Sequence, residues 1–390
     1  MTAERDLPSH DFWPHPDLPA QWVSHHWRGP VRLEGWTLHA VRLPYTRTVQ
    51  WADVVEESAL YLILELRTKD GLTGVAEATI KPTWSGVTLR SLTACLEEIF
   101  LPRLAALDLA DGEPIQTMLA SFPENQTARM LIDNAWWDLR TQAAGMPMWK
   151  FWGGTQHTDV SCTLTRASPE QMASEAQALV ERFGFRTLKV KGGQSVRPDM
   201  DAIAAVQRAV GNEVALYVDA NGAYAANDGV GYARMLAGVG VTLVEDPYRI
   251  EPNVFFRDAQ AKLPVSLLVD FACANARDAT CFLDLGAQAL SVKPGRYGLS
   301  EAWTIARRAD ARKARTVVGL FGESMLGAVP QLAFTAAQAD RSMPAETSFL
   351  GLKEQILREP LTIAGGRITL PDAPGLASLI DWDRVRHFKA

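Results

Sequence analysis

The stretch RTLKVKGGQSVRPDMDAIAAVQRAVGNEVALYVDANGAY, residues 186–224, decides the fold class. It places two short apolar runs, 186–190 and 214–218, on either side of a helical segment. Such alternation is typical of parallel strands joined by crossover helices. Further apolar runs follow in the same pattern at 241–244, 265–269, 288–292 and 315–320. The chain from about 156 onward therefore predicts a parallel α/β domain.

Ionisable residues stand at the C-terminal ends of these apolar runs. They are Lys189 and Lys191, then Asp219, Glu245, Asp270 and Lys293. From Lys191 onward they are separated by 28, 26, 25 and 23 residues, which is about one strand–helix unit. A closed barrel brings such strand ends to one mouth, whereas a doubly wound sheet spreads them along a line. We therefore predict an α/β fold with a TIM-type barrel and a site at its mouth.

The carboxylates of this set predict a metal site. Asp219, Glu245 and Asp270 would repel one another around a common centre unless a cation lies between them. Oxygen ligands without a nearby His or Cys favour Mg²⁺, with Mn²⁺ as the alternative, over zinc.

The lysines predict acid/base chemistry. Lys189 and Lys191 are two residues apart on one strand, so both side chains point into the mouth. We expect each ammonium to lower the pKa of the other, which would let a lysine act as a base near neutral pH. Lys293 follows the fourth strand after that of Lys191, nearly opposite in a ring of eight. Taken singly, a charge after a strand is usually a helix cap or a solvated side chain, but capping does not explain this regular spacing.

Composition narrows the class of protein. The 390 residues are 47% hydrophobic and 22% charged, which describes a soluble globular chain of about two domains. A net charge of −6 argues against nucleic acid as a partner. The longest apolar run, 60–64, is far shorter than the ~20 residues of a membrane span, and the N-terminus does not resemble a secretory signal. Four cysteines without CxxC spacing favour the cytoplasm.

Changes in residue composition and periodicity along the sequence predict that the chain has three structural parts. An arm is expected at 1–30, which either packs across a subunit interface or over the site, or is a plain surface extension. An α+β capping domain is expected at 31–155, with a hairpin at the Asp70-Gly71 turn and helices at about 87–107 and 125–144. The barrel domain is expected at 156–354, and about 355–390 is expected to complete the cap.

The chain resembles the enolase superfamily, and within it the muconate-lactonizing-enzyme subgroup of the mandelate racemase/muconate lactonizing enzyme family. That subgroup is marked by Lys-x-Lys on the second barrel strand and Lys on the sixth. The matching stretches are GVAEA at 74–78, ARMLIDNAWWDLRTQAAGMPMWKFWGG at 128–154, LKVKGG at 188–193, VDANGAY at 218–224, VEDP at 244–247, SVKPGRYG at 291–298 and GGRITLPDAPGL at 365–376. The resemblance implies a modified (β/α)7β barrel with an N-terminal capping domain.

The resemblance also implies roles for the charged residues. Asp219, Glu245 and Asp270 would bind Mg²⁺, Lys191 and Lys293 would be the acid/base pair, and Lys189 would assist Lys191 and the substrate carboxylate. The shared step of the family is abstraction of the proton α to a carboxylate, through an enediolate. Two departures, Phe271 where Glu is usual and Leu299 where Gly is usual, bear on the substrate. The absence of His between positions 157 and 387 disfavours the His-dependent branches.

Three reactions are open to such an intermediate. SVKPGRYG most resembles N-succinylamino acid racemase and o-succinylbenzoate synthase members, so a racemase or epimerase of an N-acyl amino acid or similar compound is preferred. A syn-dehydratase or a cycloisomerase of the same subgroup is the alternative. A catalytically silent barrel is a third hypothesis, from a different class of protein.

Several residues are candidates for contact with a small-molecule carboxylate substrate. Arg47 would pair with a distal carboxylate such as a succinyl group, or is only a hairpin charge. Glu323 would face a substrate ammonium, and Trp84 and Phe321 would stack on a cation unless they are core residues. Tyr45, beside Arg47 in a cap loop, and Asn221, in VDANGAY, complete the set. A homo-oligomer is expected from the resemblance.

Overall fold

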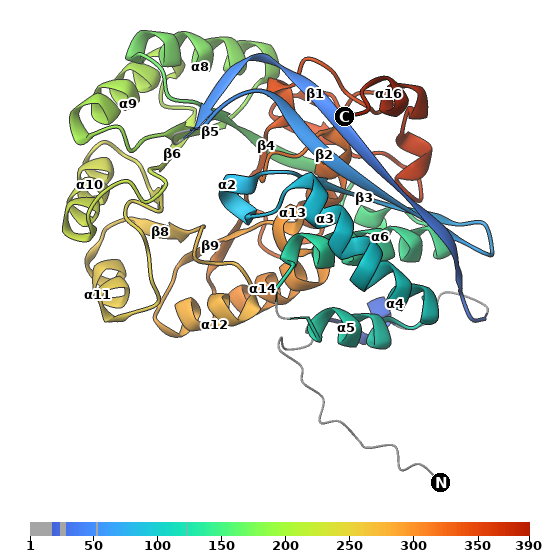
Figure 1. Ribbon diagram of the computed structural model, residues 1–390. Coiled ribbons are helices and arrows are strands. Elements are labelled where there is room, and N and C mark those ends of the chain that lie inside the picture. Colours follow the sequence, from blue (N-terminus) through green and yellow to red (C-terminus); the bar gives the residue numbers. More distant parts are fainter. Residues whose placement is uncertain (1–17, 24–28, 52–53, 123) are drawn as a thin grey trace.

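The computed structural model describes residues 18–23, 29–51, 54–122 and 124–390. In Figure 1 a ring of strands and helices, green through orange, is crossed on one side by the long blue strands near the N-terminus. The chain is thus a barrel with a strand-rich cap, which confirms the predicted fold class.

The barrel is a parallel sheet that returns on itself. Neighbouring strands pair in parallel from β4 through β10, and β11 pairs in parallel with β4. The strands are β4 (His157–Leu164), β5 (Thr187–Lys191), β6 (Ala215–Asp219), β7 (Leu243–Glu245), β8 (Ser266–Val269), β9 (Ala289–Val292), β10 (Arg315–Val318) and β11 (Ala345–Thr347). The six runs predicted from the sequence are β5 through β10. The ring is completed by β4, whose polar residues alternate with apolar ones, and by the three-residue β11, neither of which gives a continuous apolar run.

The outer helices begin and end where local sequence signals place them. In α8 (Pro169–Phe183), the Ser168 hydroxyl accepts a hydrogen bond from the Gln171 N–H at 3.3 Å, as in the predicted capping box. The helix ends at Gly184, whose φ of 71° favours glycine. The other helices of this region are α9 (Val196–Val210), α10 (Ala226–Gly238), α11 (Val254–Lys262), α12 (Ala276–Asp284), α13 (Pro294–Tyr297), α14 (Leu299–Ala311) and α15 (Met325–Ala337).

The cap is an antiparallel meander backed by helices. β1 (Leu33–Trp51) pairs with β2 (Val54–Thr68), and β2 turns through the predicted Asp-Gly hairpin into β3 (Thr73–Thr79). The predicted helix at 87–107 is continuous but contains a π-helical turn, η1. The helices are α2 (Pro82–Ser85), α3 (Leu89–Cys95), η1 (Leu96–Phe100), α4 (Leu101–Ala106), α5 (Gly112–Ala120), α6 (Gln126–Ala143) and α7 (Met148–Phe151).

The C-terminal segment runs back to the cap. The Arg42 N–H donates to Phe388 O at 2.9 Å, and the Ala390 N–H donates to Ala40 O at 3.0 Å. On the way, β13 pairs antiparallel with β4 at the start of the barrel. The elements of this segment are η2 (Phe349–Gly351), β12 (Ile363–Ala364), β13 (Arg367–Thr369), η3 (Ala377–Leu379) and α16 (Trp382–His387).

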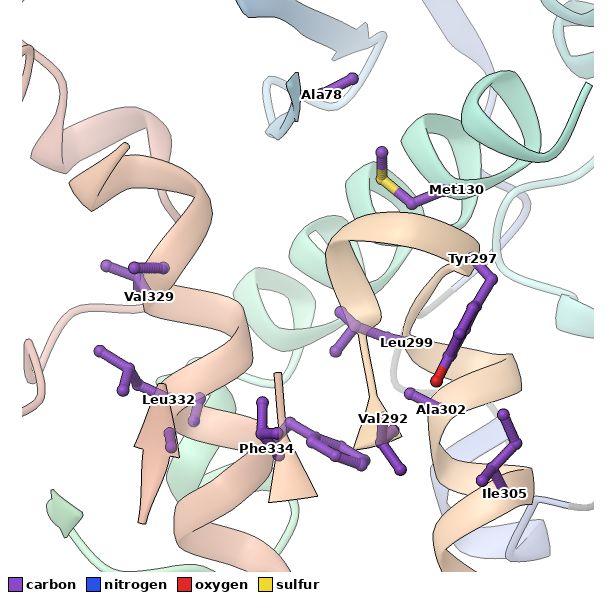
Figure 2. Packing of buried hydrophobic residues seen from close by; sticks show 14 of the residues in the cluster. Ala78, Met130, Val292, Tyr297, Leu299, Ala302, Ile305, Val329, Leu332 and Phe334 are labelled. Atoms are coloured by element: carbon purple, nitrogen blue, oxygen red, sulfur yellow. The ribbon is translucent and has the colours of Figure 1, made fainter. Parts of the chain in front are cut away.

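Cap and barrel share one apolar core. Figure 2 shows Met130 of α6 close to Tyr297 and Leu299, with Val292 and Ile305 beneath them. Both polar ends of the Asn134 side chain, also on α6, bond the backbone around α13: Nδ2 donates to Pro294 O at 3.3 Å, and Oδ1 accepts from the Leu299 N–H at 2.8 Å. The cap helix therefore contacts the segment that follows β9.

Part of the predicted arm packs on the chain itself. The Trp22 ring, in the short helix α1 (Ala20–Val23), lies 4.7 Å from the Trp303 ring and 6.5 Å from that of Trp137, between centroids. Most of the rest of the arm lies outside the described residues. Across the described ranges, none of the helices has both the length and the apolar content that crossing a bilayer requires.

Candidate active site at the barrel mouth

One cavity of about 270 Å³ brings the predicted charged residues together. We call it the mouth cavity. Lys189 and Lys191 reach it from β5, Asp219 from β6 and Glu245 from β7; Asp270 and Lys293 follow β8 and β9 directly. The cap contributes Tyr45, Arg47, Lys81 and Trp84 to the lining.

Lys189 contacts more carboxylates than Lys191 or Lys293 does. Its Nζ lies 3.1 Å from Asp219 Oδ2, 2.7 Å from Glu245 Oε2 and 2.9 Å from Glu346 Oε1. Burial opposes its charge, but the three carboxylates outweigh burial and hold the pKa of Lys189 well above its usual value. The expectation that the ammonium groups lower each other's pKa is therefore wrong for Lys189. This side chain is suited to hold a negative group rather than to accept a proton.

Lys191 and Lys293 each contact a different carboxylate. Lys191 Nζ lies 2.5 Å from Asp219 Oδ2 and donates to Asn221 Oδ1 at 3.2 Å. Lys293 Nζ lies 2.6 Å from Asp270 Oδ1 and donates to Asp270 Oδ2 at 2.7 Å. Three strands, β6 to β8, separate their strands in the ring. Two amines thus enter one cavity from well-separated strands.

The three carboxylates differ in how far nearby lysines compensate their negative charge. Burial opposes ionisation of Asp219 and Asp270, but the neighbouring lysines outweigh it; they hold the pKa of Asp219 well below its usual value and lower that of Asp270 to about 2. Glu245 is different, because burial and the nearby Asp219 and Asp270 raise its pKa well above the usual value despite Lys189. Negative charge is thus least compensated at Glu245.

This donor set fits a hard divalent cation by its chemistry. Both carboxylate oxygens of Glu245 and Oδ1 of Asp270 are buried and accept no hydrogen bond of regular geometry from the described residues, although Glu245 Oε2 and Asp270 Oδ1 each form an ion pair with a lysine. Oxygens of this kind are the ligands that Mg²⁺ prefers. Within the described ranges, however, no group of three or more His, Cys, Asp or Glu side chains is arranged to hold a metal ion as it stands. The lysine ammonium groups contact the same carboxylates, so a divalent cation would compete with them.

Glu346 is a site residue that sequence reasoning missed. It lies on β11, and its Oε1 accepts from Lys189 Nζ at 2.9 Å and from the Tyr217 hydroxyl at 2.6 Å. Its Oε2 accepts from the Leu320 N–H at 3.1 Å. The signal that could have found it is the one used for the other strands, an ionisable residue in a buried strand, but β11 is too short to stand out.

The six candidates for substrate contact divide into two groups. Tyr45, Arg47, Trp84 and Phe321 line the mouth cavity. Asn221 and Glu323 do not belong to its lining: Asn221 bonds Lys191 and Asp219, and Glu323 is buried, with both carboxylate oxygens accepting from the Phe321 N–H at 2.8 and 3.0 Å. The structure thus gives no support to Glu323 as a residue that faces a substrate ammonium.

One of the aromatic candidates, Trp84, lies over a lysine. The Trp84 ring centroid lies 4.9 Å from Lys293 Nζ, within cation–π range. Phe271 and Phe321 meet the Trp84 ring edge to face at 5.9 and 6.0 Å. Phe271, which replaces the expected Glu, is 54% exposed and lies outside the lining of the mouth cavity, behind the Trp84 ring and under the Arg296 guanidinium, whose carbon is 5.5 Å from its ring centroid.

Two family models match the chain. Residues 37–153 match "Mandelate racemase / muconate lactonizing enzyme, N-terminal domain", and residues 171–384 match "Enolase C-terminal domain-like". Together they cover most of the cap and the barrel.

Curated relatives with different reactions are similar over most of their length. Muconate cycloisomerase 1-2 of Acinetobacter lwoffii is 27% identical, over 91% of this chain and 95% of the relative. L-Ala-D/L-Glu epimerase of Bacillus subtilis is 26% identical, over 86% and 93%. The o-succinylbenzoate synthase of Geobacillus stearothermophilus is 27% identical, over 84% and 88%.

A solved structure has the same architecture. The muconate lactonizing enzyme from Mucobacterium Smegmatis, complexed with muconolactone, superposes with a TM-score of 0.87 at 27% identity. The match covers 93% of this chain and all of the other.

Proposed function

The chain is an enzyme of the isomerase or lyase type that belongs to the mandelate racemase/muconate lactonizing enzyme family of the enolase superfamily, and we propose that it racemises or epimerises an amino-acid derivative. The proton α to the carboxylate of an N-acyl amino acid or similar compound is removed on one face and returned on the other. We place this small-molecule carboxylate in the mouth cavity, with a homo-oligomer in the cytoplasm as the working form.

The observation that carries the proposal is the placement of Lys191 and Lys293. Their amines enter one cavity from strands that are separated by three others. Inversion at a carbon requires a proton acceptor on one face and a donor on the other. This arrangement supports a mechanism in which both lysines exchange a proton with the substrate. It does not favour one in which a single lysine is the base and the other only supplies positive charge.

In the proposed cycle the neutral amine of one lysine takes the α-proton, and the ammonium of the other delivers a proton to the opposite face. Lys189, which three carboxylates keep charged, orients the substrate carboxylate and offsets its charge. Trp84 and the cap loops exclude water above Lys293. Asp219, Glu245 and Asp270 would hold Mg²⁺, or Mn²⁺, which would supply positive charge for the substrate carboxylate when bound.

The test follows α-hydrogen exchange by NMR. The protein is incubated in D₂O with Mg²⁺ and a panel of N-acyl amino acids and dipeptides, each as separate enantiomers. We expect deuterium at the α-carbon and conversion between enantiomers, both abolished by EDTA. Lys191→Ala and Lys293→Ala should each stop conversion, whereas Lys262→Ala, which removes an exposed lysine on α11, should behave as wild type. Exchange that persists in both site variants would rule out the two-lysine mechanism.

A second candidate is kept because the relatives include a cycloisomerase and a synthase. A product that lacks water, or that carries a new ring, would identify the chain as a dehydratase or a cycloisomerase on the same scaffold. No exchange and no metal binding would instead indicate a catalytically silent barrel.

A further inference from the structure

Resting on the proposed function, we infer that the substrate is an amino-acid derivative whose distal group is neutral and apolar rather than a second carboxylate. The inference concerns the part of the mouth cavity beyond the strand ends, where cap and barrel loops meet. It is carried by the apolar lining and by the partners of the two basic residues there.

Much of the lining outside the charged cluster is apolar. Its members come from β1, α8, the loop after β10 and η2, and they include Val49, Leu179, Leu320, Phe321 and Leu350. Trp84 continues this surface from the cap. An apolar group gains free energy when it covers such a surface, whereas a charged group loses its hydration there.

Arg47, the expected partner of a distal carboxylate, already contacts a carboxylate of the protein. Its Nη2 donates to Glu175 Oε1 at 2.9 Å and Oε2 at 3.0 Å, and to the Thr165 hydroxyl at 2.9 Å. Arg47 lies on β1 rather than in the expected cap loop, and Glu175 lies on α8, so this pair also joins a strand of the cap to the barrel. Both side chains border the mouth cavity.

Lys81, the other basic residue of the distal lining, is also paired with a carboxylate, and its pair is more deeply buried than that of Arg47 and Glu175, whose side chains are 52% and 33% exposed. Its Nζ contacts Glu56 Oε2 in β2 and lies 3.4 Å from the Tyr45 hydroxyl. The side chain of Lys81 is only 10% exposed, so the pair is largely withdrawn from water. Breaking such a pair leaves a poorly solvated charge, which is strongly unfavourable.

In the distal part of the cavity, each of these two positive side chains is thus neutralised by a carboxylate of the protein. A substrate carboxylate placed there would have to displace Glu175 or Glu56, or lie beside it as a like charge. A neutral apolar group meets neither obstacle. The pairs around Arg47 and Lys81 therefore act against dianionic substrates and leave apolar ones unaffected.

The experiment compares two N-acyl derivatives of the same amino acid, one N-succinyl and one N-(4-methylpentanoyl), in which an isopropyl group replaces the carboxylate at equal size. Binding to the protein in Mg²⁺ is measured by calorimetry. We expect the 4-methylpentanoyl compound to bind roughly tenfold more tightly or better, as typical of a site that excludes a charge. In Glu175→Gln, Arg47 loses its anionic partner, so the preference should shrink at least several-fold through tighter binding of the succinyl compound.

Glu181→Gln, on the same helix but away from Arg47, is the matched control and should keep the wild-type ratio. Tighter binding of the succinyl compound to wild type, or binding of neither compound, would overturn the inference, as would an unchanged ratio in Glu175→Gln. α-Proton exchange in the same samples is a separate readout: a preference for the apolar compound without exchange of either would refute the proposed reaction and leave the inference standing.

Discussion

Tyr297→Phe tests how the fold holds Lys293. The N–H of Lys293 donates to the Tyr297 hydroxyl at 2.7 Å, inside the core region of Figure 2. Both residues are buried, at 3% and 6% exposure. Phenylalanine keeps the ring and its packing but removes this acceptor. Because a buried donor without a partner costs about 1–3 kcal/mol, we expect the free energy of unfolding to fall by about that amount.

Urea unfolding measures this loss of stability. We expect a lower urea concentration at the midpoint of unfolding and an unchanged dependence of the unfolding free energy on urea concentration. Tyr248→Phe is the matched control, since the Tyr248 hydroxyl is buried and accepts or donates no hydrogen bond among the described residues; we expect no loss of stability there. Exchange of the two substrate enantiomers gives a second readout, because only one α-proton faces Lys293 in the proposed mechanism. Tyr297→Phe should slow exchange of that enantiomer more than of the other. Wild-type stability, or equal slowing of both enantiomers, would refute the reasoning.

Three further predictions concern pH, the N-terminal helix and the metal. Burial raises the pKa of Asp138 from 3.8 to about 7, so between these values the folded chain binds a proton that the unfolded chain lacks, and stability rises as pH falls. Asp138→Asn should therefore remove roughly 2 kcal/mol from the difference in unfolding free energy between about pH 5.5 and about pH 7.5; an unchanged difference would contradict the shift. Trp22→Ala should lower the free energy of unfolding by about 1–3 kcal/mol, because the half-buried ring loses its contact with Trp303 at 4.7 Å, and an unaltered urea midpoint would exclude that contact in solution. Mg²⁺ should raise the Tm of wild type, with reversal by EDTA, and should have little effect on Asp270→Asn; equal shifts in both proteins would place the metal elsewhere.

Local sequence patterns were sufficient for most individual elements. The capping box at Ser168 and the glycine at 184 bound α8 because both signals act within a few residues on backbone groups of the helix ends. Six of the barrel strands were predicted because each is a short apolar run. β4 and β11 were not, because their burial depends on neighbours that are far away in sequence; in β11, Glu346 is buried only because Lys189 and Tyr217 meet it across the ring.

The sequence by itself determined the repeat of strand and helix and the charge at each strand end. That repeat was enough to predict the barrel and to assemble Lys191, Asp219, Glu245, Asp270 and Lys293 at one mouth, because the spacing between successive charges is a property of the chain. Only the tertiary structure decided how the charged side chains that line the mouth cavity are paired. Distances between side chains far apart in sequence, such as the 2.9 Å between Arg47 Nη2 and Glu175 Oε1, depend on how the cap sits on the barrel, which no local pattern encodes.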